Sequence, residues 1–147
     1  MNAPRRFAEL SPFVVLRKYR RRRSRAGIAA VEFAVCLPIL MAMIMGVIES
    51  SNAVFLQQSL TSAAYEAANV ASAIGGTSAD AQTRANAVLT ALGVKNSTVS
   101  INPTVTTATP IGTTIVVTVS APFSANSLVF GYIGSPTLAA KITIPHL

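Results

Sequence analysis

A long apolar run over residues 28–48 dominates the hydropathy pattern of the chain. The run carries Glu32 as its only charge, and ten of its 21 residues are Ile, Leu, Val or Phe. As a helix rising 1.5 Å per residue it measures about 31 Å, close to the ~30 Å thickness of the hydrocarbon core of a bilayer. The run therefore predicts one transmembrane helix over residues 28–48, in which Pro38 is tolerated.

Beyond this run, apolar residues recur every three or four positions, and this pattern predicts that the helix continues over residues 49–74. The stripe consists of Ala53, Leu56, Leu60, Ala63, Ala67, Val70 and Ile74. A one-sided stripe is typical of a helix that covers a core, and the pair Gly75-Gly76 predicts its end. The alanines at positions 63, 64, 67 and 68 are interpreted as good helix formers rather than as a surface for another helix.

The remaining residues predict a second helix and three strands. The helix spans 78–92, with Thr77 or Ser78 as its cap and Gly93 as its stop. The strands span 97–103, 113–123 and 136–145, and the second, rich in β-branched residues, is expected to be central. Residues 75–147 are few for an independent core, so helix 49–74 is expected to cover the sheet. The predicted class is α+β: a long N-terminal transmembrane and amphipathic helix on a small antiparallel sheet, with a second short helix.

Charge is concentrated before the apolar run. Nine of the twelve basic residues of the chain lie in the first 25, and five of them directly precede the run: Arg20, Arg21, Arg22, Arg23 and Arg25. A nucleic-acid-binding domain would spread its basic residues over a folded face, so no nucleic acid partner is expected. Arginines beside a span instead hold the N-terminus in the cytoplasm. Residues 1–27 are thus predicted to be a basic cytoplasmic leader, and residues 49–147 an extracytoplasmic head.

Glu32 is the one unfavourable residue for insertion into a lipid bilayer. The ten large apolar residues contribute on the order of −3 to −6 kcal/mol, whereas a carboxylate at mid-membrane costs about +2.5 to +3.5 kcal/mol. Insertion is favoured, and more so because Glu32 lies near the basic end. An ionisable residue inside a span is by default a functional site that needs a partner.

The spacing between Gly27 and Glu32 suggests where the partner comes from. Cleavage after Gly27 would create an α-amine on Ile28, with Glu32 at the fifth position of the product. The stretch "GIAAVEF" in this respect resembles the type IV pilin superfamily, in which a prepilin peptidase removes a short basic leader. The resemblance implies a cleavage site at Gly27 and Ile28, and implies that Glu32 pairs with the amine of a neighbouring subunit during assembly.

The helix as a whole resembles TadE-like proteins of tight-adherence (Tad) systems, most strongly over residues 24–74. The pattern combines "AAVEFA", "LPIL", a run ending in "GVIE", and a "QQ–L–AA–EAA" tail. The family commonly has "AAREGAR" where this chain has "AAYEAAN" at 63–69, so functions tied to those positions do not transfer. The resemblance implies a pilin-like fold and a minor pilin or pseudopilin that takes part in assembly of a Tad-type adhesive pilus or a related secretion apparatus.

The partners implied are the prepilin peptidase, other pilin and pseudopilin subunits, the inner-membrane assembly platform and the lipid bilayer. The implied location is the bacterial inner membrane, as a single-pass protein with a cytoplasmic N-terminus and a periplasmic C-terminus, or incorporated into an extracellular pilus. Two alternatives stay open. One is an uncleaved single-pass protein whose periplasmic head binds a partner. The other, disfavoured because the run exceeds a signal peptide's 7–15 apolar residues, is a secreted protein released near Ala53.

No enzymatic activity is expected from the sequence. It contains no GxxxxGK[ST], HExxH or GxSxG motif, and its single histidine, His146, has no Cys, Asp or Glu nearby in sequence. The sequence therefore predicts no catalytic residues, no metal site and no cofactor. Cys36 is the only cysteine, so no intramolecular disulfide forms.

Overall fold

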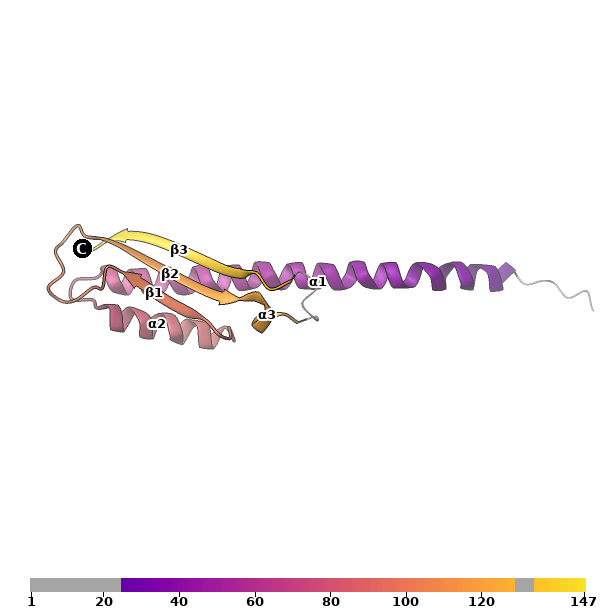
Figure 1. The fold of residues 1–147 in the computed structure, drawn as a ribbon, viewed down its shortest axis with the longest axis horizontal. Coiled ribbons are helices and arrows are strands. Elements are labelled where there is room, and N and C mark those ends of the chain that lie inside the picture. Colours follow the sequence, from indigo (N-terminus) through magenta and orange to yellow (C-terminus); the bar gives the residue numbers. More distant parts are fainter. Residues whose placement is uncertain (1–24, 129–133) are drawn as a thin grey trace, which may run out of the picture. The chain divides into compact units, whose positions relative to one another are not determined.

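The computed structural model describes residues 25–128 and 134–147 and gives the chain an α+β fold (Figure 1). Its elements in chain order are α1 (Arg25–Ser72), α2 (Ser78–Ala91), β1 (Thr98–Asn102), β2 (Thr114–Pro122), α3 (Phe123–Asn126) and β3 (Thr137–Pro145). The predicted class of a long helix, a short helix and a three-stranded antiparallel sheet is confirmed. The chain divides into two units, residues 1–37 and 38–147, and each is described by itself.

In the first unit, the described residues are the N-terminal part of α1. Its apolar side chains are exposed all round the helix, including Ile28, Val31, Phe33 and Val35. The helix continues into the second unit, and over Gly27–Ser72 it meets the length and hydropathy requirements for a membrane span, with none of its most apolar 18-residue stretch buried in protein. Apolar residues that cover every face of an unpacked helix suit lipid as the surrounding solvent. The described residues thus include one N-terminal apolar helix that could span a membrane.

In the second unit, the three strands form a sheet in the order β1-β2-β3, with both neighbouring pairs antiparallel. Val117 at the centre of β2 faces Ile101 of β1 and Ile142 of β3. Burial alternates along β2 with a period of two, and Ile115, Val117, Val119 and Ala121 are the buried positions. Side chains on a strand alternate between its faces, so one face of the sheet is covered. The prediction that this strand is central is confirmed.

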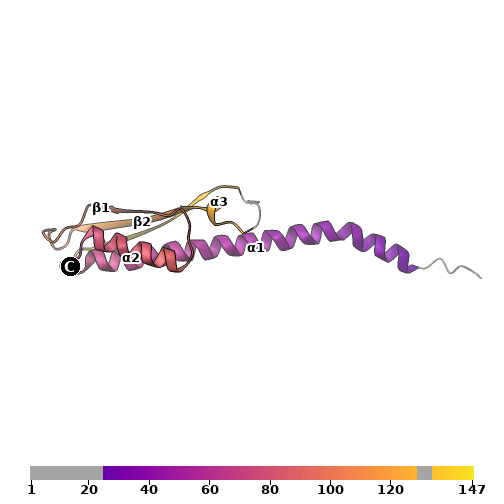
Figure 2. The same ribbon diagram turned by 90° about the horizontal axis from the view of Figure 1, so that it is seen from below.

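The part of α1 beyond the apolar run and the whole of α2 cover the same face of the sheet, as Figure 2 shows. Leu56 and Leu60 of α1 and Leu89 of α2 join the buried residues of β2 in one core. The expectation that the long helix supplies the missing layer is therefore confirmed. The predicted stripe was wrong at Ile74, which is 88% exposed, because α1 ends at Ser72 before that position.

The alanines of α1 do more than favour the helix. Ala63, Ala64, Ala67 and Ala68 are fully buried and belong to the core. Their small side chains let the backbone of α1 approach the elements packed on it, as close packing demands. The burial of Ala63 and Ala67 follows the predicted stripe, whereas the burial of Ala64 and Ala68 beside them was not predicted.

The boundary between β2 and α3 also differs from the prediction. Phe123 was predicted to end a strand over 113–123, but the strand ends at Pro122 and Phe123 begins the four-residue helix α3. Its side chain is fully buried, and its backbone N–H donates to the carbonyl of Pro136 at 2.9 Å. The chain therefore turns one residue earlier than the β-branched run suggested, and an aromatic ring anchors the turn.

The cap of α2 supports a prediction of stability. The backbone N–H of Asp80 donates to Oγ1 of Thr77 at 3.2 Å, which satisfies one of the unpaired donors of the first turn. Replacing Thr77 with alanine is expected to lower the free energy of unfolding by about 1 kcal/mol. Urea unfolding of the full chain in mild detergent measures this. The exposed Thr83 inside α2 is the control, because Thr83→Ala is expected to change stability by less than about 0.5 kcal/mol. Equal effects of the two variants would contradict a capping role.

Candidate functional site

The predicted cleavage site lies in the first turn of α1. Gly27 and Ile28 are both exposed, and a Cβ added at Gly27 would meet no atom within 4 Å. The packing of the described residues therefore gives no reason for a glycine at this position. The first backbone N–H groups of a helix have no partner within it, so a terminal turn opens more easily than a central one. The peptide bond between Gly27 and Ile28 thus lies in a helical turn that opens more easily than the centre of α1 does.

Glu32 lies one helical turn after Ile28, on the same face of α1. Its side chain is exposed, and its carboxylate has no hydrogen bond or ion pair with the part of the chain that the structure describes. A carboxylate in this setting is well tolerated in water but costly in lipid, where it needs an opposite charge. The assignment of Glu32 to subunit pairing stays a prediction.

The arginines predicted to set the topology cannot be placed from the structure. Arg20, Arg21, Arg22 and Arg23 lie outside the described residues. Arg25 is the first residue of α1, and its side chain is not described. Their role in holding the N-terminus in the cytoplasm stays a prediction from the sequence.

The structure reveals a buried carboxylate that the sequence reasoning missed. Glu49 follows directly after the apolar run, and its place in the sequence suggests only a charged residue at the far membrane interface. In the structure its side chain is fully buried, and the hydroxyl of Ser127 donates to its Oε1 at 2.8 Å. The two residues are 78 positions apart, so no local pattern could have predicted this contact.

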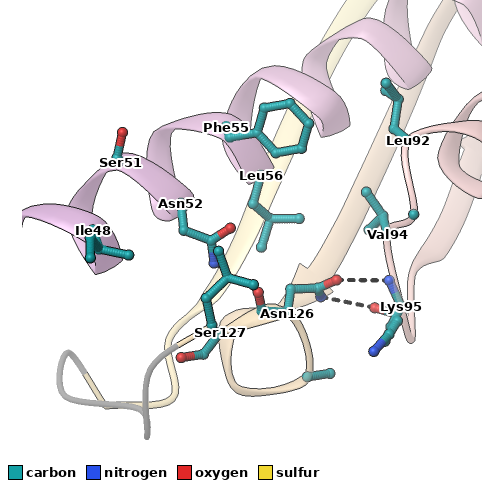
Figure 3. A pocket seen from close by; sticks show the side chains of 13 residues that line it. Ile48, Ser51, Asn52, Phe55, Leu56, Leu92, Val94, Lys95, Asn126 and Ser127 are labelled. Carbon is teal, nitrogen blue, oxygen red and sulfur yellow. Dashed lines mark hydrogen bonds between the residues drawn. The ribbon is translucent and has the colours of Figure 1, made fainter. Parts of the chain in front are cut away.

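A second polar contact set joins three segments beside this carboxylate. Oδ1 of Asn126 accepts from the backbone N–H of Lys95 at 2.8 Å, and its Nδ2 donates to the carbonyls of Lys95 and Pro122, each at 3.0 Å. Asn52 of α1 donates from Nδ2 to the carbonyl of Asn126 at 2.7 Å. These bonds hold the end of α3 and the segment after α2 against α1. They border an apolar pocket, shown in Figure 3.

Among the described residues, no group of three or more His, Cys, Asp or Glu side chains lies close enough to hold a metal ion. His146 is buried near the C-terminus, with Nδ1 3.0 Å from the backbone oxygen of Leu147. The ion pair of Glu66 and Arg84 links α1 to α2 at 3.0 Å, but both side chains are substantially exposed, so it contributes little stability.

Comparison with known proteins assigns the first part of the described chain. The family model described as "TadE-like protein" matches residues 27–69, which begin at Gly27 and lie within α1. The resemblance noted from the sequence is therefore confirmed over this segment. No curated protein and no solved structure matches the chain.

Proposed function

We propose that this TadE-like protein acts as a minor pilin or pseudopilin in the assembly of a Tad-type adhesive pilus or a related secretion apparatus. The family match associates the chain with Tad pili. The more specific role as a pilin or pseudopilin rests on the position at which the match starts. The match begins at Gly27, at the start of an exposed apolar helix whose only charge between residues 28 and 48 is Glu32. The role is structural rather than enzymatic.

The proposed arrangement follows from the solvent that each part of α1 requires. Residues 28–48 lie in the bacterial inner membrane, with the arginines before them in the cytoplasm. The head over residues 49–147 then lies in the periplasm or on the surface of a fibre. The burial pattern supports this division, because α1 is apolar and exposed before Glu49 but packs one face on the sheet from Leu56 onward.

The proposed chemistry is the hydrolysis of one peptide bond, followed by the pairing of two opposite charges between subunits. A prepilin peptidase cuts after Gly27 and leaves an ammonium group on Ile28, one turn from Glu32. Each of these charges is costly in lipid alone, and the cost falls when the two are paired. Pairing between neighbouring subunits therefore favours one axial register and opposes others. The assembly platform and the other pilin subunits are the partners that this step requires.

Cleavage is tested by the N-terminus of the protein isolated from the membranes of its native host. We expect the wild-type chain to begin at Ile28, and its intact mass to show loss of residues 1–27. The Gly27→Arg variant should keep Met1, because a large charged side chain replaces a residue with no Cβ at the scissile bond. Gly27→Ala is the matched control, since the space around Gly27 accommodates a methyl group, and this variant should still be cut.

Other results point to the two rival functions. A wild-type chain that starts at Met1 would refute the cleavage and favour a tethered protein whose head binds a periplasmic partner. That rival has one observation in its favour, because Gly27 and Ile28 are helical and the first turn must open before cleavage. A loss of about fifty residues would indicate release near Ala53. The structure opposes this, because Ala53 lies inside α1 and packs against the core.

A further inference from the structure

An apolar pocket lies at the end of the head from which α1 continues toward its N-terminal part. Its cavity volume is about 610 Å³, within the ~300–1,000 Å³ range of pockets that bind small molecules. Figure 3 shows that its wall is built from α1, the segment after α2, and the end of α3. The large apolar side chains of the wall are Ile48, Phe55, Leu56, Leu92, Val94 and Leu128.

Most polar groups of this wall are already used by the fold. Asn126 bonds to both backbone groups of Lys95, and Asn52 bonds to the backbone of Asn126. The Lys95 side chain is exposed, and no carboxylate among residues 25–128 and 134–147 forms an ion pair with it. The pocket thus offers an occupant an apolar surface and one cation.

The position of the pocket along α1 indicates which layer of a bilayer would surround it. Ile48 is the last residue of the apolar run and the first wall residue on α1, and Leu56 is the last. Eight residues of helix cover roughly 12 Å. The polar layer of a bilayer extends roughly 5–8 Å beyond the hydrocarbon on each side. A helix inserted up to Ile48 therefore places the lower part of the pocket in the headgroup layer.

Several large apolar side chains of the pocket wall expose much of their surface, which is unfavourable in water. Leu128 is 74% exposed, Phe55 53% and Leu92 37%, and all three lie in the part of the head next to the span. Contact with lipid would remove this apolar surface from water, which is favourable in proportion to the area covered. The apolar pocket is continuous along α1 with the apolar run, so the same bilayer that surrounds the run meets the pocket.

From the apolar wall of the pocket, its position along α1 and the charge of Lys95, we propose that this pocket binds an anionic phospholipid of the bilayer that α1 spans. The apolar wall contacts the glycerol and upper acyl region, and the ammonium group of Lys95 contacts the phosphate. The lipid fixes the base of the head at the membrane surface. This inference rests on the proposed membrane arrangement and adds to it a ligand and a binding residue. It does not depend on cleavage after Gly27.

Tryptophan fluorescence tests the pocket, because the natural chain contains no tryptophan. The full chain carrying Leu92→Trp is reconstituted in vesicles of phosphatidylcholine and phosphatidylglycerol, with bromine on the acyl chains of one lipid at a time. Bromine quenches a nearby indole. We expect strong quenching by both lipids at Leu92→Trp, and stronger quenching when phosphatidylglycerol carries the bromine. Adding Lys95→Ala should remove this preference.

Two further positions calibrate the measurement. Met41→Trp inside the apolar run should be quenched equally by either brominated lipid. Ile111→Trp should be quenched by neither, since Ile111 is 82% exposed in the connection between β1 and β2, at the opposite end of the head (Figure 1). Leu128→Trp provides a second pocket position in case Leu92→Trp disturbs the end of α2.

Each alternative result overturns a defined part of the inference. If Met41→Trp is quenched but neither pocket variant is, the lipid site is refuted and the membrane arrangement stands. If Met41→Trp is not quenched, both fail. Equal quenching by the two brominated lipids, or a preference that survives Lys95→Ala, refutes the assignment of an anionic lipid to Lys95. Pocket fluorescence that responds to the protein-to-lipid ratio, and not to bromine, would place a second copy of the chain there instead.

Discussion

Replacing Glu32 with alanine is expected to abolish fibre assembly while leaving membrane insertion and cleavage intact. Insertion should improve slightly, because the variant removes the one charge of residues 28–48. Cleavage should persist, because the change lies at the fifth residue after the scissile bond. Assembly should fail, because each subunit would then place an unpaired ammonium group in lipid. Breaking a buried ion pair on one side costs about 3–5 kcal/mol, which weakens each subunit contact by more than about a hundredfold.

The measurement compares surface fibres, membrane-bound protein and N-terminal sequence in strains that carry each variant. Glu32→Gln is the closest control, because it keeps the shape and polarity of the side chain and removes only its charge. It should fail as alanine does. A second variant moves the charge by one position, combining Glu32→Ala with Phe33→Glu, and so rotates it by about 100° on the helix. It should also fail. Normal fibres in Glu32→Gln would refute charge pairing, and normal fibres in the moved-charge variant would refute a fixed register.

Local patterns were sufficient to predict most of the fold. The alternation along β2 required a half-buried strand, and its β-branched residues made it the central one. Thr77 before a helical stripe and Gly93 after it predicted α2, and the structure shows Thr77 as its cap. Gly93 has a φ of +70°, a conformation that glycine adopts without strain. Such signals act within a few residues, which is the range that a sequence pattern can report.

The contacts around the base of the head could not be predicted, because they join distant segments. Glu49 meets Ser127, and Asn52 meets the backbone of Asn126, across 78 and 74 positions. A glutamate after an apolar run is usually a solvated residue, whereas the fold buries Glu49 fully and bonds it to Ser127, the residue after α3. The burial of Ala64 and Ala68 was missed for a related reason. Alanine favours helices whether it is exposed or packed, so its identity does not report its surroundings.

The predicted N-terminal site differs in kind from these missed contacts. Gly27, Ile28 and Glu32 were selected from spacing and from resemblance, and the structure leaves all three exposed and without packing roles. We propose that these three residues, which the fold of the described chain does not use and which lie together at the start of the matched family segment, serve contacts with other molecules. The head shows the reverse, because Glu49 and Asn126 are used fully within the fold. One helix therefore combines an apolar segment that is exposed in the described chain with a segment that packs in the core of the head.

The second large effect concerns the stability of the head, at Phe123. This ring is fully buried where β2 gives way to α3, and α3 in turn carries Asn126 to the polar contacts beside Glu49. Phe123→Ala is expected to lower the free energy of unfolding by about 3–5 kcal/mol, the range for truncating a buried aromatic ring. This is a large share of the roughly 5–15 kcal/mol that stabilises a typical domain.

Phe55→Ala is the matched control, because Phe55 is 53% exposed, and it should cost less than about 1 kcal/mol in detergent. Urea unfolding of the full chain, followed by circular dichroism, measures both. Equal losses at the two positions would show that the turn into α3 does not depend on its aromatic anchor.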